Sequence, residues 1–167
     1  MNNTEYMNKF SEKLKSYFDI EYDKKIFDRK FNMFAKFNQR TSRYLILKKA
    51  EFYAFQNNEY IFYENIYENI DRSHILHIKN FLDENVEKII NINKEHMCSI
   101  LTFILCGNID LDDDTKKAIK RFKYYKSFAF GFKGWVNVKL IFINPETNDI
   151  YTNKFGRGDV KKLLFNN

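Results

Sequence analysis

The sequence predicts a single α+β domain built on a mixed, mostly antiparallel sheet with about three helices, in the order α-β-β-β-α-β-α-β-β-β. Three observations support this prediction. The chain has 167 residues, the usual size of one domain. Stretches with apolar residues every three to four positions alternate with stretches of period two. Only 5 glycines and 1 proline interrupt them, and neither a linker nor an internal repeat divides the chain.

The N-terminal half predicts one helix followed by three strands. A helix is expected over residues 4–18, where apolar side chains such as Tyr6 and Phe10 recur at helical spacing and Thr4 can act as the N-cap. Alternating apolar residues from Phe31 to Phe37 indicate a strand. A second, aromatic-rich strand is expected over 44–55 and a third over 60–63, joined by a turn at 56–59.

The C-terminal half predicts two helices and several strands. The clearest helix spans 71–91, with Asp71 or Ser73 as its cap. Residues 97–106 are apolar at both parities, which indicates a strand covered on both faces. Three aspartates at 112–114 open a short helix that ends on basic residues. Strands are then expected over 127–132, 135–143 and 150–154, with the tail 160–165 docking as a last strand. Parity places Phe128, Phe130 and Phe132 in the core.

Composition indicates a folded cytoplasmic protein from an AT-rich bacterial or phage genome. Hydrophobic residues make up 44% and charged residues 30%, which excludes wholesale disorder. No apolar run reaches the ~18 residues of a membrane span, and no signal peptide is expected. Residues with A/T-rich codons, Lys, Asn, Ile, Phe and Tyr, form more than half the chain. Cys98 and Cys106 are expected to be free, because eight strand steps would separate them by roughly 26 Å.

The strongest candidate binding segment interleaves basic and aromatic residues. Net charge is +6, but coding bias supplies lysine and only six of the 28 basic residues are arginine, so charge alone is weak support for nucleic acid. Between residues 116 and 135, rings could stack on bases while cations neutralise phosphates. In the alternative interpretation, the basic residues form the solvent-exposed face of a helix and the aromatic residues after them belong to the core. The candidate residues are Lys116, Lys117, Lys120, Arg121, Lys123 and Lys126 for phosphate or other anions, and Tyr124, Tyr125 and Trp135 for aromatic contact.

Enzymatic signatures are weak throughout. Helix, meander, helix and strand in that order also begin the restriction-endonuclease-like α/β/α sandwich, the alternative fold. That class carries an acidic-x-Lys pair that holds Mg²⁺, but here residues 48–51 place Lys49 two positions before Glu51, the reverse order. His74 and His77 are three residues apart on the predicted helix, yet no further ligand lies near them in sequence. No catalytic residue, metal ligand or cofactor is therefore predicted.

Two stretches carry a family resemblance. Residues 31–63 (FNMFAKFNQRTSRYLILKKAEFYAFQNNEYIFY) and 122–156 (FKYYKSFAFGFKGWVNVKLIFINPETNDIYTNKFG) resemble a family of small uncharacterised proteins found mostly in clostridia and related Firmicutes. The resemblance implies no activity and carries over no functional residue.

The first functional hypothesis is a non-enzymatic binding protein, regulatory or inhibitory, that docks a protein partner or forms a homodimer through exposed aromatic side chains. Nucleic-acid binding through 116–135 is the alternative, and a divergent metal-dependent nuclease is the second alternative. No membrane partner is expected.

Overall fold

The computed structural model describes residues 1–37, 58–90 and 98–165. Helices and strands of this part are α1 (Asn3–Leu14), β1 (Phe18–Ile26), β2 (Arg29–Phe37), β3 (Glu59–Asn65), α3 (Arg72–Ile90), β4 (Cys98–Cys106), α4 (Asp113–Arg121), β5 (Tyr125–Ser127), η1 (Ala129–Gly131), β6 (Trp135–Asn144), β7 (Asp149–Thr152), η2 (Lys154–Asp159) and α5 (Val160–Leu163). The α+β class is confirmed. The strand β1 was not expected, and the strand expected over 44–55 lies outside the described residues, so the expected order of the N-terminal strands stays a prediction. A fourth α-helix, α5, is added at the C-terminus.

Within the described residues the sheet has seven strands, six of them in the order β1-β2-β3-β4-β6-β5. The two central pairs, β3–β4 and β4–β6, are parallel, as crossovers through α3 and α4 require. The pairs β1–β2, β2–β3, β5–β6 and β6–β7 are antiparallel. β5 lies along the beginning of β6 and β7 along its end. The expectation of a mixed, mostly antiparallel sheet is therefore confirmed.

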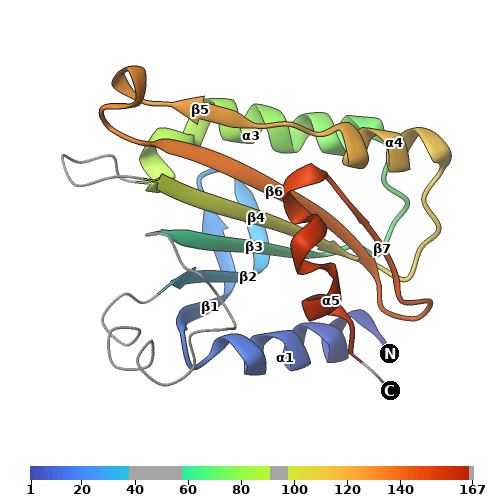
Figure 1. Cartoon of the computed structure of the whole chain (residues 1–167). Coiled ribbons are helices and arrows are strands. Elements are labelled where there is room, and N and C mark those ends of the chain that lie inside the picture. Colours follow the sequence, from blue (N-terminus) through green and yellow to red (C-terminus); the bar gives the residue numbers. More distant parts are fainter. Residues whose placement is uncertain (38–57, 91–97, 166–167) are drawn as a thin grey trace.

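Helices cover both faces of the sheet, with α3 and α4 on one side and α1 and α5 on the other (Figure 1). The central strands are apolar at consecutive positions because alternate side chains enter two separate cores. In β4, Phe103 and Leu105 pack under α3 and α4, whereas Ile104 and Cys106 pack under α1 and α5. The three layers are those of the restriction-endonuclease-like alternative, and the likeness is one of architecture alone.

The first helix is shorter than the sequence predicted. It ends at Leu14, and Phe18 opens β1, an edge strand that the sequence reading missed. The N-cap is Asn2 and not Thr4: the Asn2 side chain accepts from the Glu5 backbone N–H and the Glu5 carboxylate accepts from that of Asn2, a capping box. Charged side chains along β1 suit an edge strand, because they oppose pairing with another sheet.

Two C-terminal expectations are wrong. The tail forms the short helix α5 and not a strand, and Tyr6 Oη donates a 2.7 Å hydrogen bond to the carbonyl of Leu163, which ties this helix to α1. The strand expected over 127–132 shares only Ser127 with the observed strand β5, and η1 turns the chain after it. Phe128 is buried as expected, but Phe130 and Phe132 are 100% and 90% exposed.

Several expectations concern residues outside the described ranges: the strand over 44–55, the Lys-x-Glu pattern at 48–51 and the first half of the 56–59 turn. Both cysteines are buried, at opposite ends of β4, and they form no disulfide with each other. Within residues 1–37, 58–90 and 98–165, no helix is both long and apolar enough to cross a membrane.

Candidate anion-binding groove

An open groove with a volume of about 780 Å³ lies between helices α3 and α4. Residues three, four or seven apart lie on one face of a helix, and each helix turns one such stripe towards the groove. α3 contributes Arg72, Ser73, Ile75, Leu76 and Lys79; α4 and the residues after it contribute Asp114, Lys117, Ala118, Arg121, Phe122 and Lys123.

Each of the two helices begins at its own aspartate cap. Asp71 accepts hydrogen bonds from Ser73 and His74 at the start of α3. Asp112 accepts from the Thr115 backbone N–H at 2.7 Å at the start of α4. These hydrogen bonds lower the pKa of both carboxyl groups, so both are charged at neutral pH. The caps therefore fix where each basic stripe begins.

Cations dominate the lining of this groove. Five lining residues are basic, against one carboxylate, Asp114, which gives 5 − 1 = +4 formal charges. Asp114 itself lies 3.5 Å from Lys117 Nζ, an exposed pair one helical turn apart that contributes little to stability. Between the cations the floor is apolar, and Leu76 remains 54% exposed on it. Such a surface suits a ligand with both anionic and apolar parts.

The structure divides the six basic residues that the sequence singled out. Lys117, Arg121 and Lys123 line the groove. Lys116 and Lys120 point away from it and lie over the Tyr151 ring, with 5.4 Å and 5.6 Å from Nζ to the ring centroid.

The sixth basic residue, Lys126, forms a 2.7 Å ion pair with Glu87 of α3. The basic run in the sequence is therefore not one surface. Half of its members face the groove and half face other neighbours.

The three aromatic candidates also separate. Tyr124 is only 6% exposed, so it belongs to the core and not to a contact surface; burial and then the nearby Asp83 raise the pKa of its hydroxyl. Tyr125 is 62% exposed, and its ring lies 6.3 Å from that of Trp135. This pair is on the β5–β6 hairpin and does not line the groove.

Sequence reasoning missed Arg72 and Lys79, the two cations that α3 brings to the groove. They are some forty residues from α4 in sequence, so no local pattern connects them with Lys117 and Arg121. A signal was present within α3: Arg72 and Lys79 flank Leu76 at helical spacing, which marks an apolar position at the border of a basic stripe.

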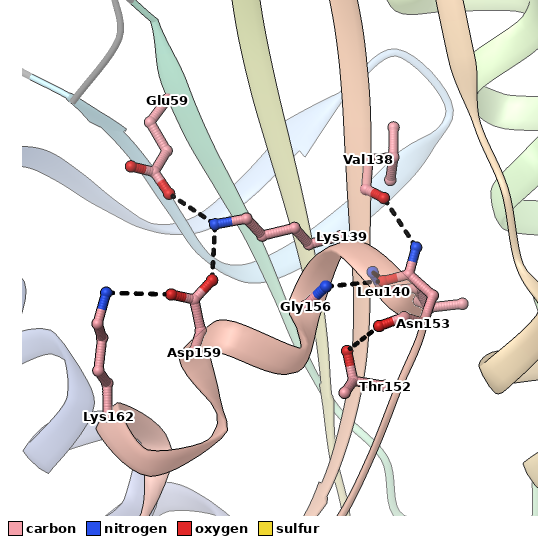
Figure 2. A network of polar contacts seen from close by, with 9 residues as sticks. All are labelled: Glu59, Val138, Lys139, Leu140, Thr152, Asn153, Gly156, Asp159 and Lys162. Carbon is pink, nitrogen blue, oxygen red and sulfur yellow. Dashed lines mark hydrogen bonds and ion pairs between the residues drawn. The ribbon is translucent and has the colours of Figure 1, made fainter. Parts of the chain in front are cut away.

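A second charged cluster lies on the opposite face of the sheet, where β3, β6, η2 and α5 meet (Figure 2). Lys139 Nζ is 2.6 Å from Asp159 Oδ2 and 3.9 Å from Glu59 Oε1, and Lys162 Nζ is 3.2 Å from Asp159 Oδ1. Two cations balance two carboxylates. The adjoining cavity of about 40 Å³ holds little more than one water molecule, so this cluster suits a structural role.

The same figure shows how Asn153 fixes the chain between β7 and η2. Its Nδ2 donates to the carbonyl oxygen of Val138 at 2.9 Å, as Figure 2 shows. The same Nδ2 donates to the carbonyl oxygen of Phe122 at 3.3 Å. Its Oδ1 accepts from the backbone N–H groups of Leu140 and Gly156 at 3.1 Å and 3.2 Å. All four hydrogen-bonding positions of this buried amide are therefore used, which anchors η2 to β6.

A third cluster joins the end of β3 to α3. Arg29 donates two hydrogen bonds to Glu64, from Nε to Oε1 at 2.5 Å and from Nη2 to Oε2 at 2.9 Å. His74 Nε2 lies 3.3 Å from Arg29 Nη2. Burial alone would raise the pKa of Glu64, but the hydrogen bonds from His74 and Arg29 outweigh it and lower the pKa. Among the described residues, no group of three or more His, Cys, Asp or Glu could hold a metal ion.

Comparison with known proteins gives a family. A family model, "Domain of unknown function (DUF8052)", matches residues 2–165. The chain belongs to this family. The DUF8052 match covers nearly the whole chain, so the predicted membership of a family without an assigned activity is confirmed. No curated protein matches the chain.

Proposed function

We propose that this DUF8052 protein is a non-enzymatic binding protein that holds single-stranded nucleic acid in the groove between α3 and α4. The supporting observation is the convergence of Arg72, Lys79, Lys117, Arg121 and Lys123 on one groove with a single carboxylate. Two of these cations are arginines, although the chain has only six, and arginine binds phosphate through a planar fork of donors.

The extent of the groove favours a polymer over a single small anion. Arg72 and Lys79 are seven residues apart, which is ~10.5 Å along the helix axis. One phosphate could contact only one end of this stripe, whereas a strand could contact both. The apolar floor around Leu76 offers contact for the faces of bases or sugars, as in proteins that bind single strands without sequence preference.

The test is a titration of a fluorescently labelled single-stranded RNA with the full-length chain over a salt series. Phosphate contacts predict that log affinity falls linearly with log salt, by about 0.7 per contact. Arg72→Gln combined with Arg121→Gln is expected to reduce this slope by about 1.4 and to weaken binding severalfold at low salt. Duplex RNA serves as the competing ligand.

A matched control removes the same charge from the other face of α4. Lys116→Gln combined with Lys120→Gln alters two cations that lie over Tyr151 and not in the groove. This pair is expected to bind nearly as the wild type does. Equal losses in both pairs would indicate general attraction to a basic protein, and no binding of the wild type at low salt would refute the proposal.

The protein-partner or homodimer hypothesis stays a prediction. Most rings of the described residues fill the two cores, and the exposed aromatic side chains, apart from Phe130 and Phe132 on one loop, lie on separate elements. The groove is the more developed surface, so the geometry favours an anionic ligand. A nuclease activity gains no support, because the described residues include no group of three or more His, Cys, Asp or Glu that could hold a metal ion.

The finer sequence-based expectations also stay proposals. We propose an origin in clostridia or related Firmicutes, from the composition and the family resemblance of residues 31–63 and 122–156. A cytoplasmic location is proposed because the two cysteines are buried and form no disulfide with each other.

A further inference from the structure

The loop between β5 and β6 presents two phenyl rings to solvent. Phe130 is 100% exposed and Phe132 is 90% exposed, while Phe128 at the base of the loop is buried. Figure 1 shows this loop at one end of the molecule, extending beyond the start of β6. We call residues 128–134 the aromatic tip. Single exposed rings are ordinary, but two on one protruding loop indicate an interaction surface.

The backbone of the aromatic tip is closed by its own hydrogen bonds. The N–H groups of Gly131 and Lys133 both donate to the Phe128 carbonyl, at 3.0 Å and 3.1 Å, and that of Phe128 donates to the Gly134 carbonyl at 2.9 Å. The tip therefore holds its rings outward in a defined conformation.

This conformation places two consecutive non-glycine residues in the left-handed region. Ala129 has φ 47° and Phe130 has φ 55°. Such strain concentrates at functional positions, because it persists only where the surrounding structure maintains it. The left-handed conformation at Phe130 leaves its ring fully exposed, so the strain gains no packing for that ring. A turn with a structural role alone would not need this conformation.

The aromatic tip is separate from the α3–α4 groove. Beyond Lys79, α3 presents two carboxylates to the segment around β5. Asp83 interacts with Tyr124, and Glu87 forms an ion pair with Lys126. These carboxylates interrupt any continuous path for phosphates from groove to tip. The tip therefore serves a contact of its own.

Size and charge identify the kind of surface that the tip fits. Two phenyl rings can bury about 300–500 Å², well below the ~800 Å² that each partner buries in a stable protein–protein interface. The tip, residues 128–134, contains Lys133 and no Asp or Glu. Aromatic rings beside a cationic side chain are typical of segments that bind the interface of an anionic bilayer.

We propose that the aromatic tip docks on the surface of an anionic lipid bilayer, with Phe130 and Phe132 entering the interfacial layer and Lys133 contacting an acidic headgroup. Surface docking needs no membrane-spanning helix. The proposal departs from the sequence-based expectation of no membrane partner, which depended on the lack of a spanning run. It goes beyond the nucleic-acid function and does not depend on it.

The experiment uses the only tryptophan of the chain as its probe. Trp135 directly follows the tip, so its emission reports the surroundings of the tip alone. The full-length chain is titrated with vesicles of phosphatidylcholine containing about 30% phosphatidylserine in low salt, and with pure phosphatidylcholine vesicles. The wild type is expected to co-sediment with the anionic vesicles and to shift its emission to the blue.

Two variants make the test specific. The double variant Phe130→Ala/Phe132→Ala removes only exposed rings, so its fold should be retained, and circular dichroism checks this. The affinity of the double variant for anionic vesicles is expected to fall about tenfold or more. Tyr67→Ala removes a ring that is 72% exposed elsewhere on the protein, and wild-type binding is expected. Absence of binding by the wild type, equal binding to neutral vesicles, or unchanged binding by the double variant would overturn the proposal.

Discussion

Lys139 of β6 and Asp159 of η2 form the closest ion pair of the network on the α1 and α5 face, with 2.6 Å between Nζ and Oδ2. Both side chains are largely buried, at 16% and 21% exposure. The pair joins the sheet to the C-terminal segment, because Asp159 also contacts Lys162 of α5. The second carboxylate near Lys139, Glu59, is farther away at 3.9 Å, and this difference gives the two acids opposite behaviour.

Asp159→Asn is expected to destabilise the protein by about 1–3 kcal/mol at pH 7, because two lysines lose their charged partner. Burial raises the pKa of Asp159, but the hydrogen bonds and charges of Lys139 and Lys162 outweigh it and lower the pKa below the usual 3.8. A carboxyl group with a lowered pKa stabilises the fold above its unfolded pKa and loses this contribution as the pH falls below that value. Urea unfolding at pH 7 and near pH 3 should show the variant's deficit shrinking in acid.

Glu59→Gln is expected to change the free energy of unfolding in the opposite direction from Asp159→Asn. Burial raises the pKa of Glu59 above 4.5, and the distant Lys139 only partly compensates. The folded state then binds the proton more tightly than the unfolded state, so ionisation of Glu59 costs stability as the pH rises above 4.5 through the folded pKa. The variant should equal or exceed the wild type by up to ~1 kcal/mol at pH 7 in the same urea assay. A loss as large as that of Asp159→Asn would contradict this assignment.

Gly156→Ala is expected to destabilise the protein by several kcal/mol or to displace η2. A Cβ at position 156 would lie 2.0 Å from Thr152 Oγ1 and 3.2 Å from Ile141 Cγ1, far inside van der Waals contact. The matched control is Gly158→Ala, two residues on, where nothing lies within 4 Å. Thermal unfolding should separate the two variants clearly, and similar melting temperatures would argue against close packing of η2 on β6.

Ala129→Gly is expected to stabilise the protein by up to ~1 kcal/mol, because glycine adopts the φ of 47° without the clash of a Cβ. Ala118→Gly, within α4, is the control with the opposite sign and should cost about 1 kcal/mol. Chemical denaturation of both variants checks the pair. Destabilisation by Ala129→Gly would show that the tip is not strained at this residue.

Strong local patterns were predicted well. The helix at 71–91 and the strand at 97–106 are observed as α3 and β4, because their apolar periodicity is long and is not interrupted. The start of α4 was also predicted, since Asp112 is an N-cap followed by an acidic first turn. In these segments local sequence and tertiary packing favour the same conformation.

In the N-terminal meander, the sequence predicted the strands that are observed as β2 and β3 but missed β1. Phe18 continues the helical spacing of Phe10 and Leu14, yet it also begins the alternation of β1. Only pairing with β2, in which Phe18 lies opposite Phe37, decides between the two. The strand expected over 44–55 lies outside the described residues, so it stays a prediction.

By itself, the sequence determined the α+β class, the two longest buried elements and the basic face of α4, because each depends on neighbours within a few positions. The tertiary structure alone decided which of those cations share a surface. Packing of α3 beside α4 brings Arg72 and Lys79 to Lys117 and Arg121, and turns Lys116 and Lys120 to Tyr151. It also decided that Phe130 and Phe132 point outward, since a left-handed turn at Ala129 and Phe130 cancels the alternation that parity assumes.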